Sequence, residues 1–103
     1  MSTKLNPADQ MLYRAVDEVL HYIWDPIGVS AVPQARDEYH SYLPLVFSRL
    51  RQGADEKAIA KYLGEVIVGS MGLSSNTSHD LEIARILIDW KEVLDEMNDR
   101  GHR

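Results

Sequence analysis

The sequence contains no cysteine and no long apolar run. Without cysteine the chain cannot build a disulfide framework, a thiolate zinc site, an iron–sulfur cluster or a cysteine nucleophile. A membrane-spanning helix needs about 18 consecutive apolar residues, and a signal peptide needs an apolar segment near its start. The sequence has neither feature, which predicts a soluble, cytoplasmic protein with no membrane partner.

The 103 residues, of which 45% are hydrophobic and 26% charged, have the composition of an ordinary globular domain. A chain of this length holds one hydrophobic core and not two. The apolar residues recur at helical spacing, and no alternating strand pattern, internal repeat or low-complexity tract is present. We therefore predict an all-α fold, a compact bundle of about four helices in a single domain over 1–103. Its ordered core is expected at about 7–98, with short flexible termini.

The first helix has a clear start and a clear end. Asn6 can cap it, and Pro7 fits its first turn, where a missing backbone N–H has no partner to lose. Apolar residues then recur one turn apart until Asp25-Pro26, where the residue before proline avoids the α region. The pattern predicts a helix over 7–24, followed by a loop.

A proline complicates the second helix. Apolar residues keep helical spacing from Tyr39 to Leu50, but Pro44 lies inside this pattern, where a proline costs about 3 kcal/mol. Two structures fit: a single helix over 36–52, kinked at Pro44, or a short turn followed by a helix that starts near Pro44. We favour the kinked helix, because the apolar stripe stays in phase across the proline. Gly53 is then its C-terminal cap.

The third helix is predicted to begin at the cap residue Asp55 and to end near Gly72. It includes the valine-rich segment GEVIVGS, because the helical period continues through it. Gly64 and Gly69 lie inside this helix and each weakens it by about 1 kcal/mol relative to alanine. We therefore expect them to allow another helix to approach closely.

The last helix is predicted over 78–98. Its cap is expected at Thr77 or Ser78, and Thr77 with Asp80 approximates a capping box. Its apolar stripe steps by three and four residues and is centred on Trp90.

The net charge of −5 is concentrated in this last helix. Residues 78–99 include seven acidic and two basic side chains, so this segment carries the entire excess. The acidic face opposite the stripe includes Glu82, Asp89, Glu92 and Glu96. A solvated face that aids solubility is the simpler interpretation. The functional interpretation is a surface for a basic protein, since nucleic acid would be repelled.

The aromatic residues suggest a second contact region. We expect Trp90 to be buried, as the centre of its stripe. Trp24 ends its helix beside a proline turn, and a core position and an exposed interface position remain equally open for it. With Tyr39 and Tyr42 it forms a second candidate partner-binding region.

The segment DEYHSY (37–42) has the densest cluster of polar and aromatic residues. His40 and Ser41 suggest nucleophilic chemistry, but neighbouring side chains on a helix diverge by about 100°, which is poor geometry for a serine–histidine pair. His21 and Asp25 have the spacing of two metal ligands, but no second pair completes a site. The sequence therefore predicts no catalytic residue, no metal site and no cofactor, and an enzyme is less expected than a binding protein.

Four motifs resemble a known family: WDPIGV (24–29), DEYHSYLP (37–44), GADEKAIAKYL (53–63) and MGL (71–73). The family is a group of small bacterial domains of unknown function that includes the YugE-type proteins, and the resemblance covers about residues 12–95. It implies a short, largely helical fold and no particular activity. The positions that match the family's signature are Asp25, Pro26, Gly28, Asp37, Glu38 and Tyr39.

Together these features predict a non-catalytic protein that binds and regulates another protein. Its most concrete form is an immunity-type protein that neutralises a basic, toxin-like partner, because opposite charge raises on-rate and specificity. It is similar in size and charge to small acidic helical proteins encoded beside bacterial toxins. The alternative is a small enzyme or ligand-binding domain with Asp25, Asp37, Glu38 and His40 around one mouth. A homodimer through the last helix is compatible with either.

Overall fold

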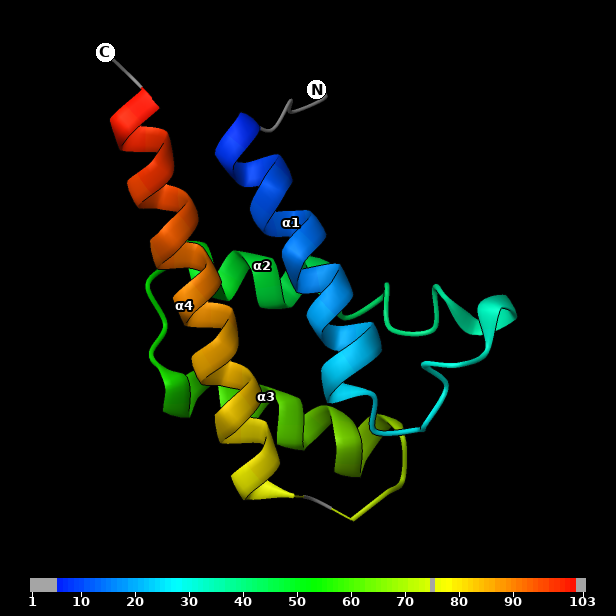
Figure 1. Ribbon diagram of the computed structural model, residues 1–103. Coiled ribbons are helices and arrows are strands. Elements are labelled where there is room, and N and C mark those ends of the chain that lie inside the picture. The colour runs from blue at the N-terminus through cyan, green and yellow to red at the C-terminus, as the bar shows by residue number, and fades with distance from the viewer. Residues whose placement is uncertain (1–5, 75, 102–103) are drawn as a thin grey trace, which may run out of the picture.

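The computed structural model describes residues 6–74 and 76–101, with side chains as far as residue 97. This part of the chain has four α-helices and no strand, which confirms the all-α prediction. The helices are α1 (Pro7–Val19), α2 (Leu43–Arg51), α3 (Glu56–Glu65) and α4 (Thr77–Gly101). In Figure 1, α1 and α4 run side by side in opposite directions, with α2 and α3 behind them.

Three short helices complete the fold. Two are single π-helical turns that extend α-helices, η1 (Leu20–Trp24) after α1 and η3 (Val66–Ser70) after α3. The third is the 3₁₀ turn η2 (Pro33–Ala35) in the long connection before α2. The predicted helix over 7–24 and the helical state of GEVIVGS are thus confirmed.

Side chains cap the helices as their chemistry requires. Asn6 accepts a hydrogen bond from the amide of Asp9 at 2.8 Å, and Asp55 accepts one from Ala58 at 2.9 Å, as predicted. The predicted cap of α4 is wrong by one position. Asn76 accepts the amide of His79 at 3.1 Å, in keeping with the preference of N-caps for asparagine over threonine.

The prediction of one kinked helix over 36–52 is wrong, and the alternative start near Pro44 is confirmed. Residues 36–42 form successive turns, and α2 begins at Leu43. Pro44 then occupies the first helical turn, where its missing N–H has no partner within the helix. Tyr39 and Leu43 are nevertheless both buried, so the apolar spacing continues across a segment that is not helical.

The two glycines of the third predicted helix behave differently. A Cβ on Gly64 would lie 3.5 Å from Oδ2 of Asp80, so α3 and α4 approach closely there, as predicted. At Gly69 nothing lies within 4 Å of that position, and the prediction of a close approach is wrong.

The two tryptophans differ sharply in exposure. Trp24 is 2% exposed and lies in the core, whereas Trp90 is 44% exposed, so the prediction of a buried Trp90 is wrong. The π-helical turn η1 explains Trp24, because residues in an i→i+5 turn rotate less about the axis and Trp24 stays on the core side with Leu20. On α4 the buried face is centred on Leu87 and its neighbours, and Trp90 lies at its edge.

Arg51 at the end of α2 ties α1 to α4. Its Nε lies 2.7 Å from Oδ1 of Asp9, and its Nη1 donates to both carboxylate oxygens of Asp95 at 2.8 and 3.0 Å. Asp95 lies towards the negative end of the α4 dipole, where an acid is unfavourable. Arg51 offsets that cost within the molecule.

Candidate functional site

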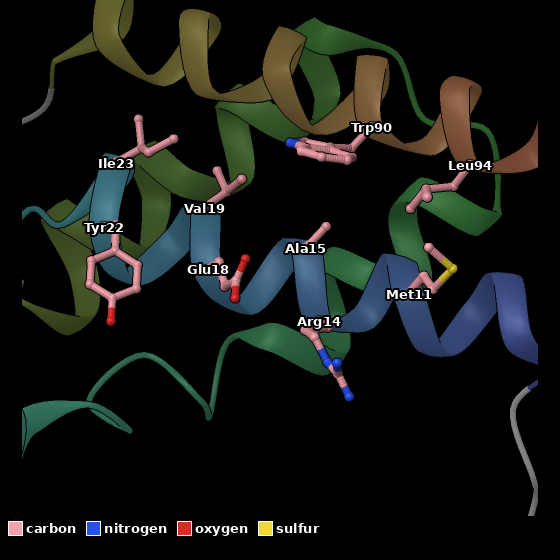
Figure 2. A pocket seen from close by; sticks show the side chains of 9 residues that line it. All are labelled: Met11, Arg14, Ala15, Glu18, Val19, Tyr22, Ile23, Trp90 and Leu94. Carbon is pink, nitrogen blue, oxygen red and sulfur yellow. The ribbon is translucent and has the colours of Figure 1, made fainter.

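A groove lined mainly by apolar side chains lies between α1 and α4. It has a volume of about 420 Å³, and its walls include Met11, Ala15 and Val19 on one side and Trp90 and Leu94 on the other. Figure 2 shows the indole ring of Trp90 projecting from α4 towards Ala15 and Val19. The small side chain of Ala15 leaves the space that the ring enters, and one face of the groove remains open.

Exposed apolar side chains gather around this groove. Six of the eleven large apolar side chains that are exposed in the described part of the chain belong to it or continue it along α4. They are Met11, Tyr22, Ile23, Trp90, Val93 and Met97. Large contiguous apolar patches are rare on monomers and mark sites of interaction.

A row of acidic residues runs along α4 beside its exposed apolar side chains, on the side away from α1. Glu82, Asp89 and Glu96 are all exposed and lie seven residues apart, so they follow one line along the helix. This line runs beside the apolar row that contains Trp90 and Val93. We call these three residues the acidic row.

The other charged side chains near the groove include both acids and bases. Glu92, also predicted in the acidic face, is exposed but lies farther round α4, beside Arg85 and the residues before α3. Arg85 is paired with Glu56. On the α1 side the groove is lined by one base and one acid, Arg14 and Glu18.

The second candidate region, around Trp24, does not form an exposed surface. Tyr39 is buried, Tyr42 is half-buried, and both rings pack on Trp24 with centroid separations of 5.4 and 6.5 Å. Side chains in such positions support the fold and are not accessible to a partner in this conformation.

The signature residues Asp25 and Tyr39 form a polar contact that fixes the turn after η1. The Tyr39 hydroxyl donates to Asp25 at 2.7 Å and accepts the amide of Ile27 at 3.1 Å. Asp25 also accepts the amides of Val29 and Ser30. Burial alone would raise the pKa of Asp25, but these hydrogen bonds outweigh it and lower that pKa, while burial and Asp25 raise the pKa of Tyr39.

Among the other signature positions, one has a backbone role in the turn and two are exposed to solvent. Gly28 has a φ of +80°, which permits this turn. Asp37 and Glu38 are exposed. Asp25, Gly28 and Tyr39 are therefore the signature positions that shape or hold this turn.

Asp80 is a buried carboxylate whose role the sequence pattern does not reveal. It was predicted to belong to a capping box, but it accepts a hydrogen bond from the indole N–H of Trp24 at 3.1 Å. Next to it, Nε2 of His79 lies 3.2 Å from the carbonyl oxygen of Trp24. The first turn of α4 thus holds the end of η1. The available signal was Trp24 itself, because a buried indole N–H requires an acceptor.

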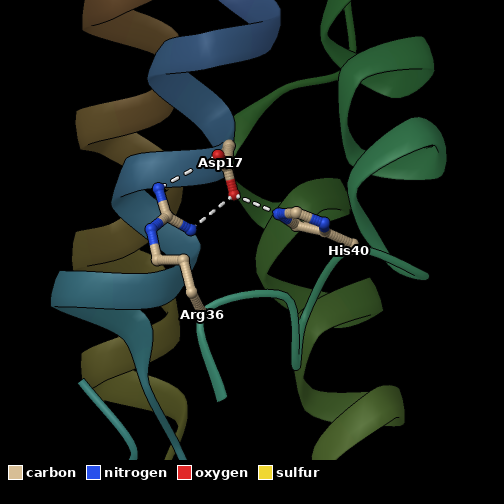
Figure 3. Close-up of polar contacts among 3 residues, drawn as sticks. All are labelled: Asp17, Arg36 and His40. Atoms are coloured by element: carbon tan, nitrogen blue, oxygen red, sulfur yellow. Dashed lines mark hydrogen bonds and ion pairs between the residues drawn. The ribbon is translucent and has the colours of Figure 1, made fainter. Parts of the chain in front are cut away.

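His40 takes part in an ion-pair cluster that also joins two segments. Its Nε2 lies 3.0 Å from Asp17 on α1, and Arg36 donates to both oxygens of the same carboxylate at 3.0 Å (Figure 3). An open depression of about 440 Å³ lies beside Asp17 and His40. Arg36 already neutralises Asp17, so this geometry fits a clamp that fastens the 33–42 segment to α1.

The four residues of the predicted catalytic or ligand-binding mouth are not brought together by their side chains. Asp25 binds Tyr39 and the turn amides, and His40 binds Asp17. No side-chain hydrogen bond joins these two to Asp37 or Glu38 in the part of the chain that the structure describes.

The two residues of the possible metal pair have other contacts. His21 is buried against the rings of Tyr22 and Tyr39, and Asp25 is committed to its turn. Among the described residues, no three or more histidine, aspartate or glutamate side chains are grouped as a metal would require. Within the same residues, no helix is long and apolar enough to cross a bilayer.

No family model, curated protein or solved structure matches the chain. The likeness to the YugE-type domains therefore stays a prediction.

Proposed function

We propose that this protein is a non-catalytic binding protein that receives another protein in the groove between α1 and α4. The observation that carries the proposal is Trp90, which is 44% exposed among six exposed apolar side chains that lie along the groove and α4. Tryptophan is among the residues that contribute most to protein–protein binding. An exposed indole with apolar neighbours is costly in water unless a partner covers it.

The chemistry of the groove favours binding over catalysis. Its polar lining consists of Arg14 and Glu18, and its other walls are apolar. A catalytic site needs convergent groups that can donate, accept or attack. The alternative, an enzyme or ligand-binding domain around Asp25 and His40, has less support because hydrogen bonds within the fold already engage both side chains.

The most concrete form of the proposed function is an immunity-type protein that blocks a basic toxin. The acidic row supports it, because opposite charge accelerates encounter and rejects wrong partners.

The test is site-specific photo-crosslinking in cells of the source organism. A photoreactive amino acid replaces Val93 in the groove or, as a matched control, Val68 on η3. Both are valines of similar accessibility, with exposed fractions of 52% and 55%. A protein that crosslinks from position 93 and not from 68 is purified and must bind the unmodified chain in solution. Equal crosslinking from both positions, or no binding by the purified protein, would refute the proposal.

A further inference from the structure

We infer that the occupant of the α1/α4 groove is a basic amphipathic helix whose lysine or arginine residues face the acidic row, Glu82, Asp89 and Glu96. This inference rests on the proposed function. It adds the secondary structure of the partner segment, its charge and its position on the surface.

The walls of the groove favour a helix over an extended segment. Both walls are helices, whose backbone groups bond within the helix except at the ends. An extended segment would place its own N–H and C=O groups against apolar side chains, at about 1–3 kcal/mol for each group left unsatisfied. A helix bonds its backbone internally and offers only side chains, which is the mode this surface can accept.

The apolar row of α4 has the spacing that a second helix can match. Ile86, Trp90, Val93 and Met97 step by four, three and four residues, and the last three are exposed. This is the spacing at which side chains of two helices interlock along a seam. A partner helix with its own apolar residues three and four apart can pack between this row and α1.

The acidic row gives the partner its charge. Its members lie two turns apart and span about 21 Å along α4. A helix lying along α4 brings every seventh residue to the same line, so lysines at that spacing meet all three carboxylates. The α1 side offers only Arg14 and Glu18, whose charges cancel. One edge of the partner is therefore expected to be basic.

A second copy of this chain fits the charges less well. In an antiparallel pair, with the two-fold axis perpendicular to α4, the acidic row of one copy faces the acidic row of the other. In a parallel pair it faces the neutral edge formed by Arg14 and Glu18. Neither arrangement supplies the positive charge that the row attracts, and the antiparallel one adds repulsion.

The experiment titrates three synthetic peptides of about 18 residues into the isotopically labelled 103-residue chain. The first has a leucine stripe with lysines at seven-residue spacing along one edge. The second has glutamates in place of those lysines, and the third has the composition of the first in an order that breaks the stripe. The readout is the indole N–H resonance of each tryptophan, with the Kd determined at two ionic strengths.

The two tryptophans give the titration an internal control. Trp24 donates its indole N–H to Asp80 in the core, so its resonance should stay in place while that of Trp90 moves. We expect the basic peptide to bind at least tenfold more tightly than the acidic one at low salt, and this ratio to shrink at high salt. Equal affinities for the basic and acidic peptides, or equal binding of the scrambled peptide, would overturn the inference.

A charge reversal locates the interaction. Glu82→Lys with Asp89→Lys should reverse the preference, so that the acidic peptide binds more tightly. Asp37→Lys with Glu38→Lys makes the same change in net charge on the exposed turn before α2 and should leave the preference as it is. If both double variants behave alike, net charge and not the acidic row determines binding, and the inference is wrong.

The results of these experiments distinguish a failure of this inference from a failure of the proposed function. If the crosslinked partner binds through the groove but presents a segment that is not a basic helix, the inference fails and the binding function stands. If the chain sediments at twice its 11.7 kDa mass, and Val93→Glu but not Val68→Glu restores the monomer, a second copy is the occupant and the inference is again wrong. If no protein depends on the groove, the proposed function itself fails.

Discussion

Two residues, Tyr39 and Asp80, make polar contacts inside a mainly apolar core. The Tyr39 hydroxyl both donates and accepts a hydrogen bond, and Asp80 receives the only polar atom of the Trp24 side chain. Removing either side chain would leave a buried group without its hydrogen-bond partner. This lowers stability more than replacing both partners by apolar groups does. Stability at the scale of residues is therefore expected to depend on these contacts more than on the exposed charges.

Tyr39→Phe is expected to lower the free energy of unfolding by about 1–3 kcal/mol, because it leaves the Ile27 amide without its acceptor and Asp25 without one of its donors. Urea denaturation measures the change. Tyr13→Phe is the matched control, since the Tyr13 hydroxyl has no hydrogen-bond partner among the described residues. Equal effects of the two substitutions would contradict the assigned role of the Tyr39 hydroxyl.

Asp80→Asn is expected to change how stability depends on pH. Burial raises the pKa of Asp80, although Trp24 and the charge of His79 oppose it. The folded chain therefore holds this proton more tightly than the unfolded chain, and the free energy of unfolding declines as pH rises from about 3.9 through the raised value. Asparagine still accepts from Trp24 but does not titrate.

The measurement for this variant is urea denaturation at several values between about pH 4 and 7. The stability of Asp80→Asn relative to the wild type should increase with pH across this window. A relative stability that decreases would show that the folded state favours the ionised carboxylate.

At the scale of elements, local chemistry predicted where most helices begin and end, because caps and prolines act over a few residues. The caps Asn6 and Asp55 and the end of the helical segment at Asp25 follow from such signals. The start of α2 was mispredicted because the apolar spacing at Tyr39 and Leu43 continues in phase through turns. Spacing shows which residues share a side of the chain, and it does not require that the chain be helical between them.

The helix α3 and the end of α2 permit a paired test with the same substitution. Gly64→Ala should raise the free energy of unfolding by up to about 1 kcal/mol, because alanine favours the helix and its Cβ would meet Asp80 at ordinary contact distance. Gly53→Ala should lower it by about 1–2 kcal/mol, because φ is +84° there and nothing else lies near the Cβ. Thermal denaturation distinguishes the two, and shifts of the same sign would contradict the account.

At the scale of the whole molecule, the sequence predicted four helices and an acidic last helix, but it placed Trp90 in the core and left the position of Trp24 open. The apolar face of α4 is wider than the part of it that α1 and α3 cover. The spacing of apolar residues alone does not show how much of such a face is buried. The burial of Trp24 depends on the π-helical turn, which rotates it back to the core. The groove, the central feature of the proposed function, therefore emerges only when the helices are packed together.

The most direct test of this account is the affinity of the purified, crosslinked partner for two double variants, measured by calorimetry. Trp90→Ala with Val93→Ala removes the centre of the groove, and Leu45→Ala with Val68→Ala removes exposed apolar side chains elsewhere. Both should unfold at similar urea concentrations, since all four side chains are exposed. We predict that the groove variant binds at least a hundredfold more weakly and that the control binds like the wild type. Unchanged affinity of the groove variant would contradict the account.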